Sequence, residues 1–275
     1  MIAADATDTP APASEETDRK RVRRTLAAIC SMLYYQGYTM AINGIGAPWI
    51  AKSFNLGESG IATLYAWISI SALGALALSR LADRIGRRRV LVTCMTATPL
   101  SAFGAALSQQ LVLFIVCEIC LYAFIGATIA GSVVMLAEEL PIPQRAKGQS
   151  YGGLAMSFGA GLCVLLMPRL ERGGYSWRWL LAISAAGVIG LPFVVHAIPE
   201  SQRWERAAER GATHASHFAD AFRKRYRRRA LPIMTCALFS AIAATAFNSW
   251  SYFHAVSVVG LPAGVTSIMI LVGGG

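Results

Sequence analysis

The chain has few charged residues for its length. Charged residues make up 15% of its 275 positions, hydrophobic residues make up 55%, and the mean hydropathy is +0.49. A soluble domain usually contains about 25% charged and about 45–50% apolar residues. The apolar residues also lie in long blocks without the polar face that a water-exposed helix needs. This pattern excludes a soluble two-domain protein and predicts an all-α polytopic membrane protein.

The sequence also lacks the residue sets that enzymes and metal centres need. No nucleophile and base, and no set of metal ligands, occurs at a spacing typical of a reaction site. All six cysteines fall inside apolar blocks, including Cys117 and Cys120 of "CEIC", and there cysteine packs as a small hydrophobic residue. Redox or metal chemistry would require access and further ligands. We therefore expect no enzymatic activity, no cofactor and no metal site.

The N-terminus does not have the order of a signal peptide. The segment "MIAADATDTPAPASEETD" is acidic and rich in Ala, Pro and Thr, whereas a signal peptide has a basic segment followed by an apolar one. This composition is typical of disorder. We therefore interpret residues 1–24 as a disordered cytosolic tail that ends in the basic cluster "RKRVRR".

The apolar blocks are long enough to cross a membrane. A helix rises about 1.5 Å per residue, so about 20 residues span a hydrocarbon core of about 30 Å. The last block ends at "LVGGG" after about twelve residues, too few to cross, so we expect a chain truncated at its C-terminus. The sequence predicts seven full spans and a partial eighth, at Leu26–Ala51, Ile61–Ser79, Val90–Ser108, Leu111–Ala137, Ser150–Leu170, Leu180–Ile198, Leu231–Val256 and from Gly264 onward.

The basic residues lie mostly on one side of the predicted membrane. Of the 25 Lys and Arg residues, all but four fall in the N-terminal tail or in the loops after spans two, four and six. The four exceptions are Lys52, Arg169, Arg172 and Arg178. Cytoplasmic loops carry the excess of Lys and Arg, so we predict a multi-pass protein of the inner (plasma) membrane with a cytoplasmic N-terminus. The net charge of +10 then follows from topology, and we expect no nucleic acid to bind.

The loop after the second span, "SRLADRIGRRRVLV", contains acid as well as base. Gly86 permits a tight turn, and Arg87, Arg88 and Arg89 anchor the cytoplasmic start of the third span. Asp83 has no such topological role, because acidic residues contribute little to orientation and a negative charge at a helix C-terminus opposes the macrodipole. We therefore expect Asp83 to pair with a positive helix N-terminus or with an arginine.

This loop resembles the signature of the major facilitator superfamily, Gly-x-Leu-Ala-Asp-Arg-x-Gly-Arg-Arg/Lys-x-x-Leu, and departs from it at Ser79. Two further cytoplasmic stretches resemble motifs of the family. "EELPIPQRAKG" is similar to Glu-x-x-Pro-x-x-x-Arg, and "IPESQRWERA" is similar to the Pro-Glu-Ser-x-Arg-Trp of sugar porters and related metabolite carriers. The resemblance extends from the first span to the seventh and implies a major-facilitator-like helical bundle.

The resemblance also implies one transporter half and the start of another. Residues 25–198 correspond to a six-span N-terminal half, and residues 199–230 correspond to a cytoplasmic linker whose arginines could bind anionic membrane lipids. Residues 231–275 correspond to the start of a C-terminal half. The rest of that half is missing from this sequence and is expected to be needed for activity.

In the family, such loops form a charge cluster that holds the outward-open state and breaks as the two halves rock. The resemblance therefore implies a cytoplasmic charge latch. A single ion pair at a wet membrane edge contributes about 0–1 kcal/mol, but several together can bias an equilibrium between two states. The residues assigned to this latch are Asp83, Arg84, Gly86, Arg87, Arg88, Glu138, Arg145, Glu200 and Arg203.

One acidic residue, Glu118, lies inside a predicted span, roughly 10 Å from its external end. A charge at the bilayer centre costs about 2.5–3.5 kcal/mol on insertion scales, so Glu118 should face a cavity, be paired or be protonated. It is a candidate for coupling to protons or for contact with a polar solute; the alternative is a structural, hydrogen-bonded role. Tyr122 follows one turn later, where many superfamily members have an arginine, and this weakens the case for an anionic solute.

Further polar residues lie in spans one and seven. Gln36 and Asn43 are seven residues apart and share a helix face, where they could line a cavity or form interhelical hydrogen bonds. Span one resembles that of aromatic-acid symporters but lacks both aspartates of their Asp-Gly-x-Asp motif. Asn248 and Tyr252 resemble the Asn-x-x-x-Tyr of sugar porters. The paired glutamines that precede this motif in hexose carriers are missing, which argues against a hexose.

The sequence thus resembles a secondary active transporter of the sugar-porter or metabolite-symporter branch of the superfamily. Such a protein would move a small organic solute by alternating access, with proton-coupled uptake as the favoured direction. Within transport, the alternative is a drug or toxin exporter. Outside transport, the alternative is a membrane receptor or anchor.

Overall fold

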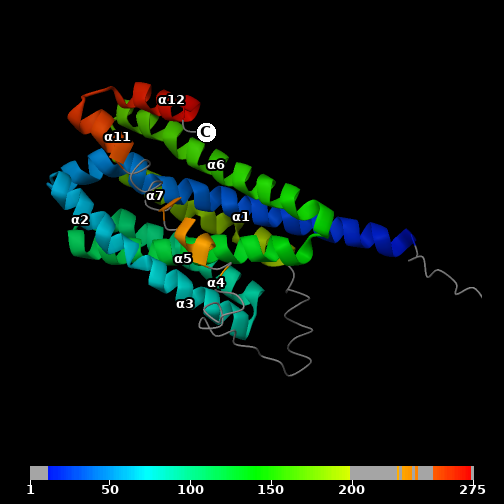
Figure 1. The fold of residues 1–275 in the computed structure, drawn as a ribbon. Helices are drawn as coiled ribbons and strands as arrows, with labels where there is room; N and C mark the ends of the chain where they lie inside the picture. Colours follow the sequence, from blue (N-terminus) through cyan, green and yellow to red (C-terminus); the bar gives the residue numbers. More distant parts are fainter. Residues whose placement is uncertain (1–11, 199–227, 229–230, 237–238, 241–249, 274–275) are drawn as a thin grey trace, which may run out of the picture.

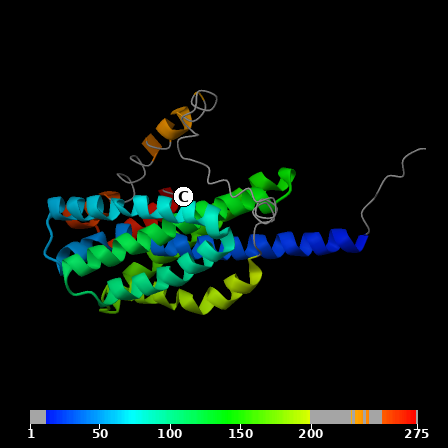
Figure 2. The same ribbon diagram turned by 90° about the horizontal axis from the view of Figure 1, so that it is seen from below.

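The described part of the chain is a bundle of long helices that run side by side (Figures 1 and 2). A computed structural model describes residues 12–198, 228, 231–236, 239–240 and 250–273, and these residues contain no strand. The elements are α1 (Pro12–Ser53), α2 (Glu58–Ser69), α3 (Ser71–Ile85), α4 (Arg87–Leu107), α5 (Leu111–Glu139), α6 (Ile142–Arg172), α7 (Arg178–Ala185), the 3-10 helix η1 (Ala186–Gly190), α8 (Leu191–Ala197), α11 (Ser251–Phe253), the π-helical turn η4 (His254–Val258) and α12 (Ala263–Gly273).

Five helical stretches in the described residues are long and apolar enough to cross a membrane. They overlap predicted spans two to six, and the prediction of an all-α polytopic membrane fold is confirmed. A long apolar run in lipid has to be helical, because only a helix satisfies all its backbone polar groups within one segment. The five stretches are Glu58–Ile85, Arg87–Leu107, Leu111–Glu139, Ile142–Arg172 and Arg178–Ala197.

Helix α1 contains the first predicted span and continues well beyond it. Its 42 residues correspond to a length of about 63 Å at 1.5 Å per residue, and both ribbon views show its N-terminal end projecting past the other helices (Figures 1 and 2). The prediction of a disordered tail over residues 1–24 therefore disagrees with the structure from Pro12 onward. The reason is that Arg21 and Arg24, near the base of this projection, bond to α5 and α8.

Two glycines allow α1 and α6 to pack with their backbones in contact. A side chain at Gly37 of α1 would collide with the backbone carbonyl of Met156 on α6, and one at Gly159 of α6 would collide with the carbonyl of Tyr34 on α1. Each helix therefore supplies one glycine to the same interface. Close approach through small residues is a common way for helices to associate in membranes, where the hydrophobic effect does not drive them together.

The described part of the bundle contains two large apolar clusters with polar residues between them, and a small third cluster of Val90, Cys94 and Ala127. One cluster surrounds the N-terminal part of the membrane segment of α1, with Ala28, Leu91 and Met135, and the other surrounds its later part, with Ile42 and Phe114. Polar groups on the intervening turns bond across helices: the hydroxyls of Thr39 on α1 and Ser184 on α7 lie 2.8 Å apart. These bonds satisfy hydroxyls that lipid and apolar side chains could not.

The last described segments pack on the bundle rather than away from it. Helix α12 lies along α6, and α11 lies against α1, as Figure 1 shows in red and orange. The ring of Tyr252 in α11 stands 6.3 Å from the ring of Trp49 in α1. The linker predicted at residues 199–230 lies outside the described residues except for Arg228.

Candidate functional site

A carboxylate is buried in the middle of the helix bundle. Glu118 on α5 has no exposed surface, and its Oε2 accepts a hydrogen bond of 2.7 Å from Nδ2 of Asn43 on α1. Asn43 is itself 3% exposed. Two of the residues that the sequence indicated independently, one in each of two spans, are therefore brought together as a pair.

Two tyrosines surround this pair. The hydroxyl of Tyr122, one turn after Glu118, donates to the backbone carbonyl of Met40 at 2.9 Å. The hydroxyl of Tyr65 on α2 donates to the backbone carbonyl of Asn43, also at 2.9 Å. The pair therefore lies where α1, α2 and α5 meet. Tyr65 was not predicted, because no motif marks it and only the packing of α2 against α5 brings it to the site.

Several buried oxygen atoms at and near the site accept no hydrogen bond in the described residues. They are Oε1 of Glu118, Oδ1 of Asn43 and Oε1 of Gln36. Gln36 lies two turns before Asn43, is fully buried, and donates through Nε2 only to the sulfur of Met95 at 3.3 Å. A buried polar atom without a partner costs about 1–3 kcal/mol, so these acceptors mark the places where a ligand could gain most.

Of the two candidates in the predicted seventh span, the structure describes Tyr252 but not Asn248. Tyr252 is fully buried, and its hydroxyl lies 3.4 Å from that of Ser267 on α12. Tyr252 packs against Trp49 of α1. Within the described residues, no hydrogen bond joins it to Glu118 or Asn43. Asn248 lies outside the described residues.

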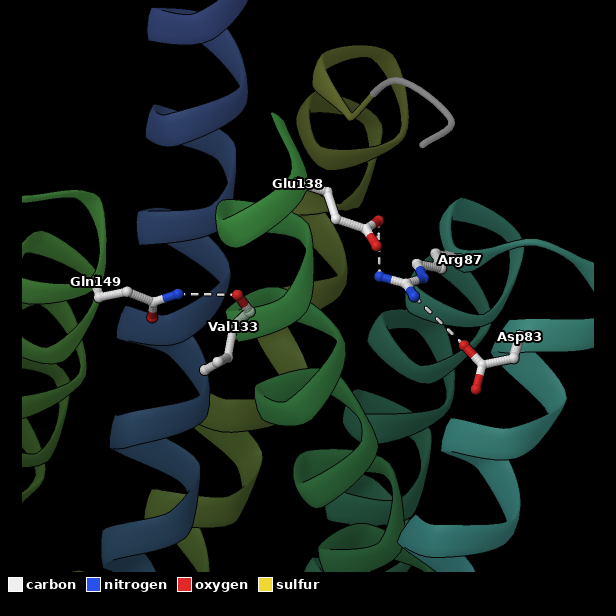
Figure 3. Close-up of polar contacts among 5 residues, drawn as sticks. All are labelled: Asp83, Arg87, Val133, Glu138 and Gln149. Atoms are coloured by element: carbon white, nitrogen blue, oxygen red, sulfur yellow. Dashed lines mark hydrogen bonds and ion pairs between the residues drawn. The ribbon is translucent and has the colours of Figure 1, made fainter. Parts of the chain in front are cut away.

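At the predicted cytoplasmic end, one arginine bridges two acids. Nη1 of Arg87 lies 2.7 Å from Oε2 of Glu138 on α5, and Nη2 lies 3.4 Å from Oδ1 of Asp83 on α3. Figure 3 shows Arg87 between the two carboxylates, beside a second link from Gln149 to the carbonyl of Val133. We call Asp83, Arg87 and Glu138 the charge network. All three belong to α3–α5, so the network ties together helices of one half.

The neighbouring Arg88 bonds to backbone carbonyls at the end of α8. Arg88 donates from Nε to the carbonyl of Ile198 and from Nη2 to that of Val195, both at 2.8 Å. Arg24 of α1 donates to the carbonyl of His196 at 2.7 Å. Because the last carbonyls of a helix have no intrahelical partner, two arginines from other helices cap the C-terminus of α8, where positive charge also suits the macrodipole.

The other residues assigned to the latch are placed as follows. Gly86 joins α3 to α4 with a φ of 107°, a conformation that favours glycine, which agrees with the predicted turn. Arg84 is exposed, and Arg145 is exposed and donates to the carbonyl of Leu140 at 3.1 Å. The structure thus places Arg145 on backbone rather than on an acid. Glu200 and Arg203 lie outside the described residues.

A further arginine at the opposite end was assigned only to topology. Arg178 at the start of α7 donates to the carbonyls of Ala106 and Ser108 at the end of α4. Its guanidinium also lies over the rings of Trp177, at 5.0 Å, and Phe54, at 5.6 Å. The sequence did contain a signal for this role: Arg178 lies between Trp177 and Trp179, on the predicted side of the membrane that has few basic residues.

Comparison with known proteins gives a consistent family. A family described as Major Facilitator Superfamily matches residues 27–275. The putative metabolite transport protein YncC of Bacillus subtilis is 28% identical over 199 residues, which are 70% of this chain and 42% of the relative. The arabinose-proton symporter of the same species is 26% identical and covers 65% of this chain and 40% of the relative. A gentisate transporter of Corynebacterium glutamicum is 22% identical over 74% of this chain and 48% of the relative.

The fold agrees with solved transporters. The partially occluded inward-open structure of the xylose transporter XylE from E. coli superposes with a TM-score of 0.65 at 18% identity, over 92% of this chain and 67% of that chain. The chain spans less than half the length of the curated relatives named above.

Proposed function

The chain belongs to the major facilitator superfamily, and on that basis we propose that it forms the N-terminal part of a secondary active transporter. This transporter moves a small organic solute across the cytoplasmic membrane by alternating access and couples that movement to protons. Relatives described as metabolite, arabinose-proton and gentisate transporters support solute transport. The family consists of transporters rather than enzymes, in keeping with the absence of a catalytic residue set in the sequence.

The observation that carries the proposal is the buried pair of Glu118 and Asn43. Glu118 is the one acidic residue within the predicted spans. It is fully buried, and one of its oxygens has no partner among the described residues. Acids in membrane spans are costly and usually mark ion or substrate pathways. A carboxyl at this position can hold a proton while it is enclosed and release it when alternating access opens it to water.

The two ends of the bundle support an oriented carrier. The charge network and the arginine caps on α8 lie at the end that the distribution of Lys and Arg assigns to the cytoplasm. We propose that a C-terminal half completes the solute site, because such sites lie between the two halves near the bilayer midplane. "The complete transporter" below means this chain together with that half.

The test compares Glu118→Gln with Glu58→Gln in the complete transporter, reconstituted into vesicles. Both variants remove one carboxylate, but Glu58 is exposed at the start of α2. We expect Glu118→Gln to retain exchange of labelled solute across the membrane and to lose accumulation driven by a pH gradient. Glu58→Gln should retain both. Unchanged accumulation driven by pH in Glu118→Gln would refute the coupling role.

A further inference from the structure

The donors around Glu118 are already engaged, whereas acceptors remain. Asn43 Nδ2 donates to Glu118, the hydroxyl of Tyr65 donates to the backbone of Asn43, and the hydroxyl of Tyr122 donates to the backbone of Met40. Oε1 of Glu118 and Oδ1 of Asn43 stay without a partner in the described residues. These two oxygens belong to side chains joined by a 2.7 Å bond, so both belong to the same site.

The site is enclosed but close to accessible surface. Met40 lies three residues before Asn43 and is 44% exposed, and Tyr122, which bonds to its carbonyl, is partly exposed. A modest shift of α1 relative to α5 would therefore uncover Glu118 from this side. Alternating access supplies a movement of that kind.

The charge of this region is negative whenever Glu118 is ionised. In the described residues, every Lys and Arg lies at or beyond the ends of the predicted spans. The titratable groups that interact electrostatically with Glu118 are Tyr65 on α2 and Tyr122 and Cys117 on α5. The sulfur of Cys117 lies against Gly104 of α4, and Cys163 on α6 interacts with Tyr122. Phenols and thiols are neutral near pH 7. An enclosed carboxylate without a cation is strongly unfavourable, so Glu118 must hold either a proton or a positively charged ligand.

Building on the proposed function, we infer that the solute carries a protonated amine that binds to Glu118 and Asn43 in place of the proton. An ammonium group has three N–H donors and no acceptor, which complements two free oxygens. Its bond to a carboxylate is charge-assisted and stronger than that of a neutral hydroxyl. A solute with a carboxylate would instead place like charges together.

The exchange is balanced in atoms and charge. The ammonium donates N–H bonds to Oε1 of Glu118 and Oδ1 of Asn43, while the carboxyl O–H of Glu118 gives its proton to water. One cation enters and one proton leaves, so the net charge of the site is the same in both states. Because proton and amine exclude one another, they cross the membrane in opposite directions. This agrees with the exporter that the sequence left as an alternative and not with proton-coupled uptake.

The pH dependence of this exchange has a defined sign. Protons compete with the amine, so amine binding weakens as the pH falls through the range in which Glu118 takes up its proton. One proton is displaced per amine, so the affinity changes by at most about tenfold per pH unit. Affinity that rises as the pH falls contradicts the inference.

The experiment uses two matched sets of probes on the complete transporter: benzylamine, benzyl alcohol and benzoate, and glucosamine, glucose and glucuronate. Binding and proton release are measured in weakly buffered detergent solution with a pH indicator. We expect at least one amine to bind tenfold more tightly than its matched alcohol and acid, and to release a proton. Glu118→Gln should lose the proton release and at least tenfold in amine affinity. Glu118→Asp should retain the release, and Glu58→Gln should behave like the unaltered protein.

The outcomes separate this inference from the proposed function. If no amine binds, or if amines bind without releasing a proton, the inference is overturned. If an alcohol or acid of either set is instead moved by a pH gradient in a manner that requires Glu118, the proposed function stands and the amine inference falls. If Glu118→Gln leaves pH-driven transport unchanged, the proposed coupling itself fails.

Discussion

Removing the two acids of the charge network one at a time should give unequal losses. Glu138 lies 2.7 Å from Arg87 with its side chain 9% exposed, whereas Asp83 lies 3.4 Å away with its side chain 42% exposed. Leaving a sheltered polar or charged group without its partner costs about 1–3 kcal/mol, and here the Glu138–Arg87 ion pair is the sheltered contact. An exposed ion pair contributes about 0–1 kcal/mol. We therefore expect Glu138→Gln to lower the free energy of unfolding by about 1–2 kcal/mol more than Asp83→Asn.

The assay is unfolding of the complete transporter in mixed micelles, at low and high salt. At about 1 M salt the Debye length falls to about 3 Å, so the small effect of Asp83→Asn should disappear while most of the effect of Glu138→Gln remains. Arg89→Gln is the matched control, because Arg89 is the exposed neighbour in the same arginine run. Equal losses for the two acid variants, or a larger loss for Asp83→Asn, would refute the reasoning from burial and distance.

Further predictions concern packing, capping, rate and completeness. Gly159→Ala should destabilise the protein by about 1–3 kcal/mol, because the new methyl group meets the backbone of Tyr34, whereas Gly153→Ala on the same helix has open space and should be neutral or stabilising. Arg178→Gln should lower the melting temperature, because two carbonyls at the end of α4 lose their donor. Asp83→Asn should lower the maximal transport rate more than the solute affinity. The 275-residue chain expressed alone should show no saturable transport.

Each of these has a clear contrary result. Equal thermal stability of the two glycine variants would show that α1 and α6 can separate at little cost. An unchanged melting temperature for Arg178→Gln would mean that water caps α4 equally well. A large loss of affinity at an unchanged rate in Asp83→Asn would contradict a role in the conformational change. Saturable uptake by the isolated chain would remove the need for a second half.

The positions of spans two to six could be predicted because lipid imposes helical structure on any long apolar run. The interruptions within them could not. Predicted span two is divided at Ile70, and predicted span six contains the 3-10 turn Ala186–Gly190. Ser69 and Ser71 flank the first site, and Gly187, Gly190 and Pro192 lie in or next to the second, but the spans were predicted from hydropathy, which carries no information on a change of helix type. The start of α1 was missed for a different reason, since its bonds to α5 and α8 join residues far apart in the sequence.

The candidate site was predicted in part. Glu118 could be singled out because an acid in a span is costly, and Asn43 because it is a polar residue seven positions after Gln36 on the same helix face. That these two residues bond depends on the relative heights of α1 and α5, which no pattern within a single helix specifies. The same holds for Tyr65, whose role depends on α2 reaching the backbone of α1.

The run of three arginines after Gly86 looks uniform as a sequence, yet its members should tolerate different replacements. Arg87 also uses two nitrogens, Nη1 and Nη2, but both of its partners are carboxylates, which still attract the positive charge of a lysine. Arg88 uses two nitrogens of one planar group to hold two carbonyls at once, a fork that the single ammonium of lysine does not reproduce. In a library of variants, lysine should therefore be accepted at the first position and selected against at the second, although the two substitutions are chemically identical.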